Sequence, residues 1–250
     1  DLACDPMYEN LMTATSHLTG KKVNRFTHIH QSIEDLVNKV KMMRMIAQKT
    51  GTCFQRCVGF DAMNATFITT YNMDKKYGTN YHERFKKWMT YVQENDLMIA
   101  GAMTDVKGNR SLKPSKQADP DLFTHVVEKR EDGVVICGAK AHMTGMANSH
   151  EMLILPTTNL LDGDQDYAIA CAVPVDAEGI THIFGRQTND QRRLQGDLDT
   201  GNSEYAIVGG ETLTVLDHVF VPWDRVFMCG ETDFAQDYVA RFAAYHRQNY

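Results

Sequence analysis

The chain has 250 residues, of which 43% are hydrophobic and 23% are charged, and its formal net charge at pH 7 is -6. This composition is typical of a folded globular protein and excludes a disordered or collagen-like chain. The negative balance disfavours nucleic acid as the main partner, because phosphate binding depends on clustered lysine and arginine. No apolar run approaches the roughly 20 residues that a membrane-spanning helix needs.

Six cysteines are spread through the chain without the regular spacing of a secreted, disulfide-rich domain. We therefore expect a reducing compartment, the cytoplasm. The sequence opens at Asp1 rather than at a methionine and stops at Tyr250 within an amphipathic, helical pattern. Both ends lead us to expect an excerpt of a longer protein.

The first helical pattern begins near Ser32 and Asp35, which are suited to a helix start. Apolar residues then recur every three or four positions, as on the buried face of a helix. The basic stretch at residues 39–44 is expected to lie on the solvent-exposed face. The expected buried stripe consists of Ile33, Leu36, Val37, Val40, Met43, Ile46 and Ala47.

Two more helical patterns follow. One runs from Cys53 to Tyr77, with Gly78 as its expected stop, and the next ends near Asn95. The second of these has an apolar stripe made of Phe85, Trp88, Met89 and Val92. Three consecutive helices predict a helical domain.

Short β-rich runs replace the helical pattern after residue 97, at 124–128, 134–137, 152–155, 167–173, 181–184 and 212–221. Asp132-Gly133, between two of these runs, is a strong signal for a hairpin. This spacing predicts a small antiparallel barrel or sandwich rather than a parallel sheet. A helical pattern returns after Thr232.

Cys53 and Cys57 lie four residues apart, which places both sulfurs on one face of a helix. Two such thiolates can share a metal ion or an iron-sulfur cluster. The same spacing also suits two buried small residues or a disulfide. The spacing alone leaves these alternatives open.

A polar, glycine-containing loop at residues 101–111 follows a strand. Its backbone N–H groups, with Lys107 or Arg110, could hold phosphates, although an ordinary surface loop has the same composition. His142 and Thr144 end a later strand and would lie near this loop if the hairpin folds back. Glu211, after two glycines, and His246, on the last helical segment, are candidate acid–base groups or ordinary structural residues.

Six segments together resemble the 4-hydroxyphenylacetate 3-hydroxylase family over essentially the whole chain. The segments at 49–59 and 245–248 resemble the dehydratase branch of that family, which acts on acyl-CoA. The other four are shared with its flavin-dependent hydroxylases. These shared segments lie at 93–97, 101–105, 138–142 and 148–151.

The resemblance implies an α+β fold of the acyl-CoA dehydrogenase type. Its expected parts are an N-terminal helical domain at 1–96, a middle antiparallel β-barrel that binds flavin at 97–231, and the start of a C-terminal helical bundle at 232–250. It also implies a homotetramer.

Two cofactors are implied by the resemblance. A 4Fe-4S cluster would be held by Cys53, Cys57 and His246, with a further cysteine beyond the end of this chain. FAD would contact Met103, Thr104, Lys107, Gly108, Asn109, Arg110, His142, Met143 and Thr144. Val106 and Asn109 depart from the usual family pattern, which has proline and aspartate there.

The implied reaction is the radical, redox-neutral dehydration of 4-hydroxybutyryl-CoA to crotonyl-CoA, with vinylacetyl-CoA isomerisation as a related activity. His246 would be both an iron ligand and a base, Glu211 and Tyr250 would face the substrate, and Gln55 would hydrogen-bond it. Two alternatives are a reduced-flavin monooxygenase acting on phenols and a non-catalytic scaffold. No nucleic acid or membrane partner is expected.

Overall fold

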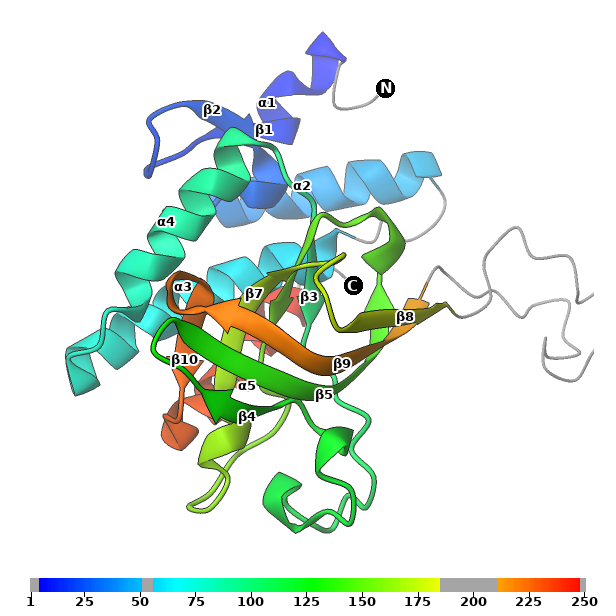
Figure 1. The fold of residues 1–250 in the computed structure, drawn as a ribbon. Helices are drawn as coiled ribbons and strands as arrows, with labels where there is room; N and C mark the ends of the chain where they lie inside the picture. Colours follow the sequence, from blue (N-terminus) through cyan, green and yellow to red (C-terminus); the bar gives the residue numbers. More distant parts are fainter. Residues whose placement is uncertain (1–4, 51–55, 185–210, 248–250) are drawn as a thin grey trace, which may run out of the picture.

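The helices lie on one side of the structure (Figure 1). A computed structural model describes residues 5–50, 56–184 and 211–247. None of the helices in these ranges has a stretch long and apolar enough to cross a bilayer. The helices are α1 (Glu9–Met12), α2 (Ile33–Thr50), α3 (Cys57–Tyr77), α4 (Tyr81–Glu94) and α5 (Ala235–His246).

Helix α2 starts where the sequence predicts. The backbone N–H of Asp35 donates to Ser32 Oγ at 3.1 Å, and the Asp35 carboxylate accepts from the N–H groups of Gln31 and Ser32 at 2.9 and 3.1 Å. These bonds satisfy N–H groups that have no partner within the helix.

The buried face of α2 differs from the predicted stripe. Met43 and Ile46 are buried as expected, but Ile33 is 81% exposed, and Val37 and Ala47 are also exposed. Lys39, expected on the solvent face, is completely buried. Lys39 can be buried because its charge is compensated by the carboxylate of Asp61, which is far away in sequence and lies on α3.

Helices α3 and α4 confirm the sequence patterns. Gly78 ends α3 in a left-handed conformation, with its N–H donating to Asp74 O at 2.8 Å. The predicted stripe of α4 is buried throughout, and Trp88 Nε1 donates to Glu151 Oε2 at 2.7 Å. Helix α3 is described from Cys57 onward, so Cys53 lies outside the described residues.

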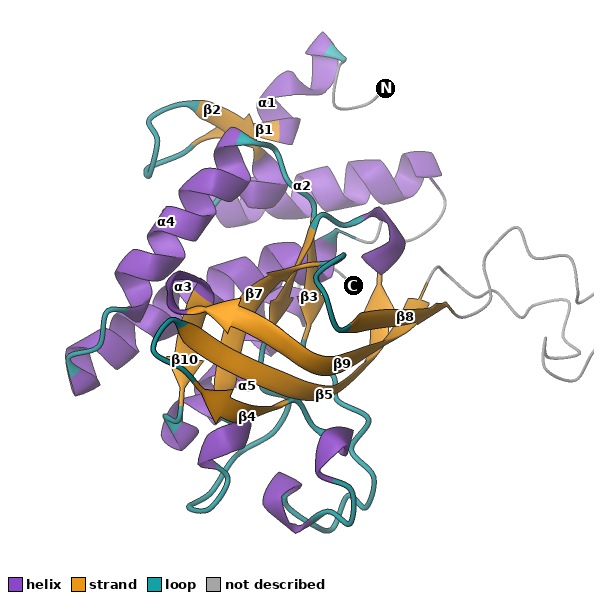
Figure 2. Cartoon of the chain, in the orientation of Figure 1, coloured by secondary structure: helices purple, strands orange, loops and turns teal. Residues whose placement is uncertain are grey.

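Two four-stranded sheets lie beside the helices (Figure 2). The first has the order β10-β7-β6-β3 and the second β4-β5-β9-β8, and a small hairpin joins β1 (Thr13–Thr15) to β2 (Lys22–Asn24). The first sheet contains β3 (Ile99–Ala102), β6 (Glu151–Ile154), β7 (Ile169–Pro174) and β10 (Val226–Cys229). The second contains β4 (His125–Lys129), β5 (Gly133–Thr144), β8 (Ile180–Phe184) and β9 (Glu211–Pro222).

The antiparallel β-barrel implied by the resemblance is not found in the described residues. Within the described ranges, each sheet keeps two edge strands, so neither closes on itself. In addition, β3 pairs with β6 in parallel, from Ile99 opposite Glu151 to Ala102 opposite Ile154. The chain between them runs through β4 and β5 of the other sheet, and such a crossover is what parallel pairing requires. The α+β class and the Asp132-Gly133 hairpin between β4 and β5 are confirmed.

The first sheet lies between the helices and the second sheet. It contacts α3 and α4 on one side and β5 and β9 on the other. Strands β3 and β6 are buried at every position, as expected for strands covered on both faces.

Helix α3 and strand β3 approach each other unusually closely. A Cβ on Gly59 would lie 1.9 Å from Ile99 O, and a Cβ on Gly101 would lie 2.6 Å from Val58 Cγ1. Because any larger side chain would clash with backbone, both positions need glycine. This contact places the first turn of α3 directly on the strand that leads into the 101–111 loop.

A buried ion pair fixes the start of that loop. Lys140 Nζ lies 2.8 Å from Asp105 Oδ1 and donates to the carbonyls of Met103 and Leu155 at 3.1 and 2.9 Å. Burial raises the pKa of Asp105, and the Lys140 ammonium opposes that rise. The loop is therefore anchored to both β5 and the segment after β6.

His30, which precedes α2, is partly buried, and both of its ring nitrogens are shielded from solvent. Neither ring nitrogen of His30 has a hydrogen-bond partner in the described part of the chain, and its ring lies 5.0 Å from that of Phe60 and 5.8 Å from that of Tyr245. Burial, helped by the nearby charges of Lys39 and His28, lowers the pKa of His30 to about 4. The imidazole is therefore neutral in the folded state at neutral pH.

The lowered pKa of His30 predicts acid sensitivity. The unfolded chain gains this proton near pH 6.5 but the folded chain only near pH 4, so stability is present above pH 6.5 and is lost as the pH falls toward 4. Protonation of His30 should lower the free energy of unfolding by about 2 to 3 kcal/mol. Urea unfolding of the parent and His30→Phe between pH 7.5 and 4.5 checks this, since the variant should lose less stability. Parallel curves for the two proteins would contradict it.

Candidate functional site

A first group of polar side chains lies where β5 and β9 pair at one end. Glu211 Oε2 lies 3.1 Å from His142 Nδ1, and Glu211 Oε1 accepts a hydrogen bond from Thr144 Oγ1 at 3.3 Å. The register of β5 shifts between Lys140 and Met143, and His142 takes a left-handed conformation in this bulge. The bulge brings the expected acid–base residue together with two of the expected flavin-binding residues.

An apolar hollow adjoins this group. It measures about 320 Å³ and is lined by His142 and Glu211 together with Ile183 and Phe184, which are half exposed. Exposed aromatic and branched side chains beside a few polar groups are suited to a flat, partly polar ring.

The 101–111 loop lies beside β5, as the sequence suggested. Ala141 N donates to Thr104 O at 2.8 Å, and Met103 O accepts from Lys140. The structure thus brings the loop and the end of β5 together. The side chain of Met143 is buried in the core, and its carbonyl accepts a hydrogen bond from Thr212 Oγ1.

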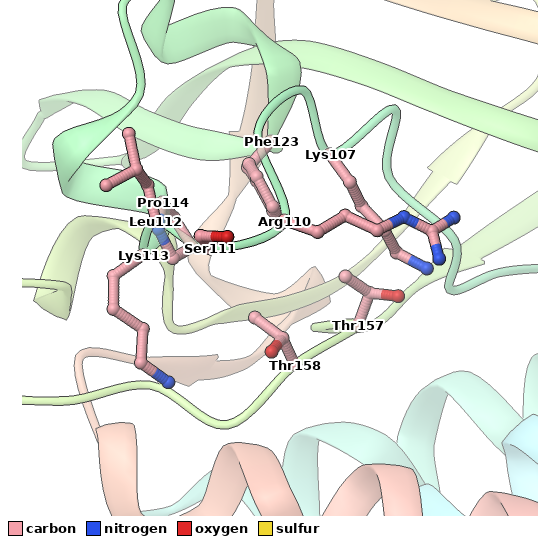
Figure 3. A pocket seen from close by; sticks show the side chains of 9 residues that line it. All are labelled: Lys107, Arg110, Ser111, Leu112, Lys113, Pro114, Phe123, Thr157 and Thr158. Carbon is pink, nitrogen blue, oxygen red and sulfur yellow. The ribbon is translucent and has the colours of Figure 1, made fainter.

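A basic pocket opens on the same loop (Figure 3). It has a volume of about 300 Å³, and three cationic side chains, two threonines and Phe123 line it. In Figure 3, Lys107 and Arg110 extend along one side of the pocket and Lys113 extends on the other. Thr157 and Thr158 reach it from the segment after β6. Such a set of donors is suited to a phosphate-bearing ligand.

Two backbone N–H groups of the 101–111 loop, which the sequence suggested as phosphate donors, already have partners within the protein. The N–H of Lys107 donates to Leu122 O at 3.2 Å, and that of Asn109 donates to Gln117 Oε1 at 3.0 Å. A Cβ on Gly108 would lie 2.8 Å from the same Gln117 oxygen, so that side chain fills the inside of the turn. These N–H groups are thus occupied within the protein, and side chains present the positive charge to the pocket.

A second group of polar residues surrounds the end of α5. His246 Nδ1 lies 2.9 Å from Asp61 Oδ2, and the other Asp61 oxygen accepts from Lys39 Nζ. Lys39 also donates to Tyr245 O at 2.9 Å. Lys39 and Asp61 are completely buried, whereas the His246 side chain keeps 20% of its exposure. The imidazole is therefore held from inside while part of it stays accessible.

Cys57 shares a helix face with Asp61. The two residues are one turn apart on α3, so the thiol and the carboxylate that holds His246 point the same way. Cys57 is also the first residue of α3 and is buried. A helix N-terminus favours the thiolate form, which is the form that binds metal.

Some expected site residues lie outside the described residues, namely Cys53, Gln55 and Tyr250. Conversely, sequence reasoning missed Lys39, Asp61, Lys113, Thr157 and Thr158. Of these, only Asp61 carried a usable signal, since it follows Cys57 by one helical turn. The others depend on long-range packing.

A third set of donor atoms belongs to Cys137, Asp217 and His218, all within 4.8 Å of one another. It sits at the other bulge between β5 and β9, where His218 N donates to Cys137 Sγ at 3.2 Å. The exposed Asp217 and His218 side chains already bond each other at 2.7 Å. The bulge between β5 and β9 explains why these three residues meet, and none of them is a predicted site residue.

Known proteins of similar sequence include the 4-hydroxybutyryl-CoA dehydratase/vinylacetyl-CoA isomerase of Clostridium aminobutyricum, at 56% identity. That match covers all of this chain and 51% of the relative. The oxygenase component of 4-hydroxyphenylacetate 3-monooxygenase from Thermus thermophilus is 29% identical, over 98% of this chain and 49% of its own length. The chain thus spans about half the length of the curated relatives it matches.

Solved structures agree with this ranking. An oxygen-tolerant archaeal 4-hydroxybutyryl-CoA dehydratase from N. maritimus superposes with a TM-score of 0.91 at 53% identity, over all of this chain and 49% of its own. A 4-hydroxyphenylacetate 3-monooxygenase oxygenase complexed with FAD gives 0.73 at 27% identity, over 96% and 48%. A glutaryl-coenzyme A dehydrogenase, at 13% identity and 0.51, shares the fold alone.

The family described as 4-hydroxyphenylacetate 3-hydroxylase, N terminal, matches residues 1–228. This range contains the bulge group, the basic pocket, Cys57 and Asp61, whereas the whole of α5, with His246, lies beyond it. The family expected from the sequence is confirmed, and the hydroxylases within it are the more distant relatives. The chain therefore belongs to the 4-hydroxyphenylacetate 3-hydroxylase family.

Proposed function

We propose that this chain carries the flavin site and most of the iron-sulfur site of a 4-hydroxybutyryl-CoA dehydratase. The observation that carries the proposal is the second polar group, in which His246 is held by the buried Asp61 on the helix face of Cys57. A hydroxylase of phenols has no chemical use for such a pair of metal donors. The 56% identity to the clostridial dehydratase supports the same choice.

The residues present fit an iron-sulfur cluster. The buried Cys57 thiol lies at a helix N-terminus, where negative charge is favoured, and a thiolate-bound cluster is anionic. His246 bonds through Nδ1 to a carboxylate, an arrangement typical of histidines that bind metal through the other nitrogen. Cys53 is proposed as a further ligand on the resemblance alone.

The residues present also fit FAD. The basic pocket of Lys107, Arg110 and Lys113 is suited to the two phosphates, and the apolar hollow beside Glu211 is suited to the ring system. A backbone hydrogen bond from Ala141 N to Thr104 O joins the loop that carries the pocket to the strand that borders the hollow. The FAD complex of the 27% identical oxygenase supports flavin binding by this fold.

When bound, FAD supplies one-electron oxidation and reduction of the substrate, and the cluster supplies a Lewis acid for its hydroxyl group. Conversion of 4-hydroxybutyryl-CoA to crotonyl-CoA removes one proton from C2, one from C3 and the hydroxide from C4. One of the two protons leaves with the hydroxide as water, and the other is returned to C4. The protein must therefore supply groups that both accept and donate protons.

His246 and Glu211 are proposed for these proton transfers. With Nδ1 facing Asp61, Nε2 is the atom that would bind iron and, when released from it, would take a proton from the substrate. The Glu211 carboxylate lies between His142 and Thr144 and remains partly exposed, so it can reach a ligand in the adjoining hollow. Tyr250 and Gln55 are proposed as further contacts to the substrate on the resemblance alone.

Isomerisation of vinylacetyl-CoA is proposed at the same site, because it needs the same removal and return of protons next to the thioester. A cytoplasmic location is proposed from the sparse, irregular spacing of the cysteines in the sequence. A homotetramer is proposed from the family resemblance, and light scattering of the full-length protein would test it.

Loss of the Cys57 thiol should remove iron. In anaerobically purified full-length protein, Cys57→Ala should lower both iron content and dehydratase activity while the helical circular dichroism signal persists. Cys171→Ala is the matched control, since Cys171 is completely buried in β7 and lies outside the proposed site. Full iron content in Cys57→Ala would contradict the assignment.

The Thr144 hydroxyl should influence the flavin. A hydroxyl donor beside the ring stabilises its reduced, negatively charged forms, so Thr144→Val should lower the reduction potential. Loss of one hydrogen bond of about 1 kcal/mol corresponds to roughly 20 mV for a two-electron couple. Potentiometry of the full-length protein measures this shift, and Thr66→Val, in the buried face of α3, is the control. Unchanged potential and turnover in Thr144→Val would show that the flavin lies elsewhere.

A further inference from the structure

We infer that Asp61, supported by Lys39, is a positioning residue that fixes His246 in the tautomer with its proton on Nδ1. This inference rests on the proposed function, because it gives the Nε2 atom its role toward the metal and the substrate.

The carboxylate is suited to this task because of what surrounds it. Asp61 Oδ2 lies 2.9 Å from His246 Nδ1, and a carboxylate without a proton can only accept a hydrogen bond. Lys39 Nζ donates to the other oxygen of Asp61, and both side chains are completely buried, so each carboxylate oxygen faces its own partner. A carboxylate oxygen that accepts at this position favours the imidazole tautomer with its proton on Nδ1.

Lys39 also fixes the backbone next to His246. Its ammonium donates to Tyr245 O at 2.9 Å, in the last turn of α5, where helix carbonyls attract positive charge. The ring of Phe242 stacks on that of His246 with centroids 5.2 Å apart. Three elements, α2, α3 and α5, therefore restrict the imidazole from different directions.

A purely structural role for Lys39 and Asp61 would lead to a different experimental result. If Lys39 and Asp61 only hold the helices together, a substitution that keeps the fold should leave the tautomer of His246 unchanged. If Asp61 positions His246, the tautomer should change even when the fold is intact. The two roles are therefore separated by a measurement on the ring nitrogens themselves.

The test uses nitrogen NMR of the full-length, metal-free protein labelled with 15N-histidine, with the His246 signals assigned by their loss in His246→Gln. Protonated and unprotonated ring nitrogens have well-separated shifts. The parent should carry its proton on Nδ1. In Asp61→Asn the amide can donate to Nδ1, so the tautomer ratio should shift toward Nε2–H by about tenfold or more, as for loss of a hydrogen bond to a charged group.

Two further variants keep the test decisive. Because Asp61→Asn leaves a buried ammonium without its partner, the protein can fail to fold. Lys39→Met combined with Asp61→Asn removes both charges, and this folded variant should still show the shifted tautomer. Glu151→Gln is the matched control, since Glu151 is a buried carboxylate that accepts from Trp88 and Arg225 away from His246. It should leave the His246 signals unchanged.

A second readout concerns the protein with its metal. Anaerobically purified Lys39→Met/Asp61→Asn should contain less iron than the parent, and the 15N coupling of histidine to the reduced cluster in pulsed EPR should weaken or disappear. An Nε2–H tautomer in the parent, or a tautomer ratio in the double variant equal to that of the parent, would overturn the inference. A parent with the Nδ1–H tautomer but no cluster would instead overturn the proposed function and leave the positioning role in place.

Discussion

The contact between Lys39 and Asp61 is the interaction on which the arrangement of the helices depends. Removing both charges from water costs several kcal/mol per ion, so the pair is tolerated only where further bonds satisfy it. Here Tyr245 O and His246 Nδ1 supply those bonds. Helices α2, α3 and α5 must therefore meet in one arrangement, in which His246 is held at the end of α5 with part of its ring exposed. The contacts that the buried Lys39–Asp61 pair requires therefore also set the position of His246 in the proposed site.

Glycine packing relates this helical group to the flavin surface. The first turn of α3, which begins with Cys57, lies against β3 through Gly59 and Gly101, where no Cβ would fit. Strand β3 leads directly into the 101–111 loop, and Lys140 anchors that loop to β5. One rigid path therefore runs from the proposed cluster ligands to the proposed flavin surface. In the proposed reaction, one substrate would contact both cofactors, FAD for electron exchange and the cluster for its hydroxyl group, and this would need a fixed spacing between the two sites.

Local patterns in the sequence predicted much of this structure, and long-range partners decided the rest. The start of α2 at Ser32, its buried Met43, the stop of α3 at Gly78 and the hairpin at Asp132-Gly133 all follow from neighbouring residues. Lys39 could not be placed, because only Asp61 on another helix makes its burial tolerable. The parallel pairing of β3 with β6 depends on a crossover of some fifty residues. The N–H groups of Lys107 and Asn109 are occupied by Leu122 and Gln117, which both lie beyond the loop. The site was predicted mainly by the family resemblance, and spacing alone identified only the Cys57 helix face.

The presence of both cofactors in one protein is the central claim. The most direct measurement is anaerobic purification of the full-length protein followed by an absorption spectrum, with chemical analysis of iron and flavin. A dehydratase should show the flavin bands on top of a broad iron-sulfur shoulder, and the shoulder should bleach on exposure to air or to an iron chelator. Flavin bands without iron would indicate a hydroxylase, and a spectrum with neither would indicate a scaffold. Either result would contradict the assignment of a flavin and an iron-sulfur cluster to one dehydratase.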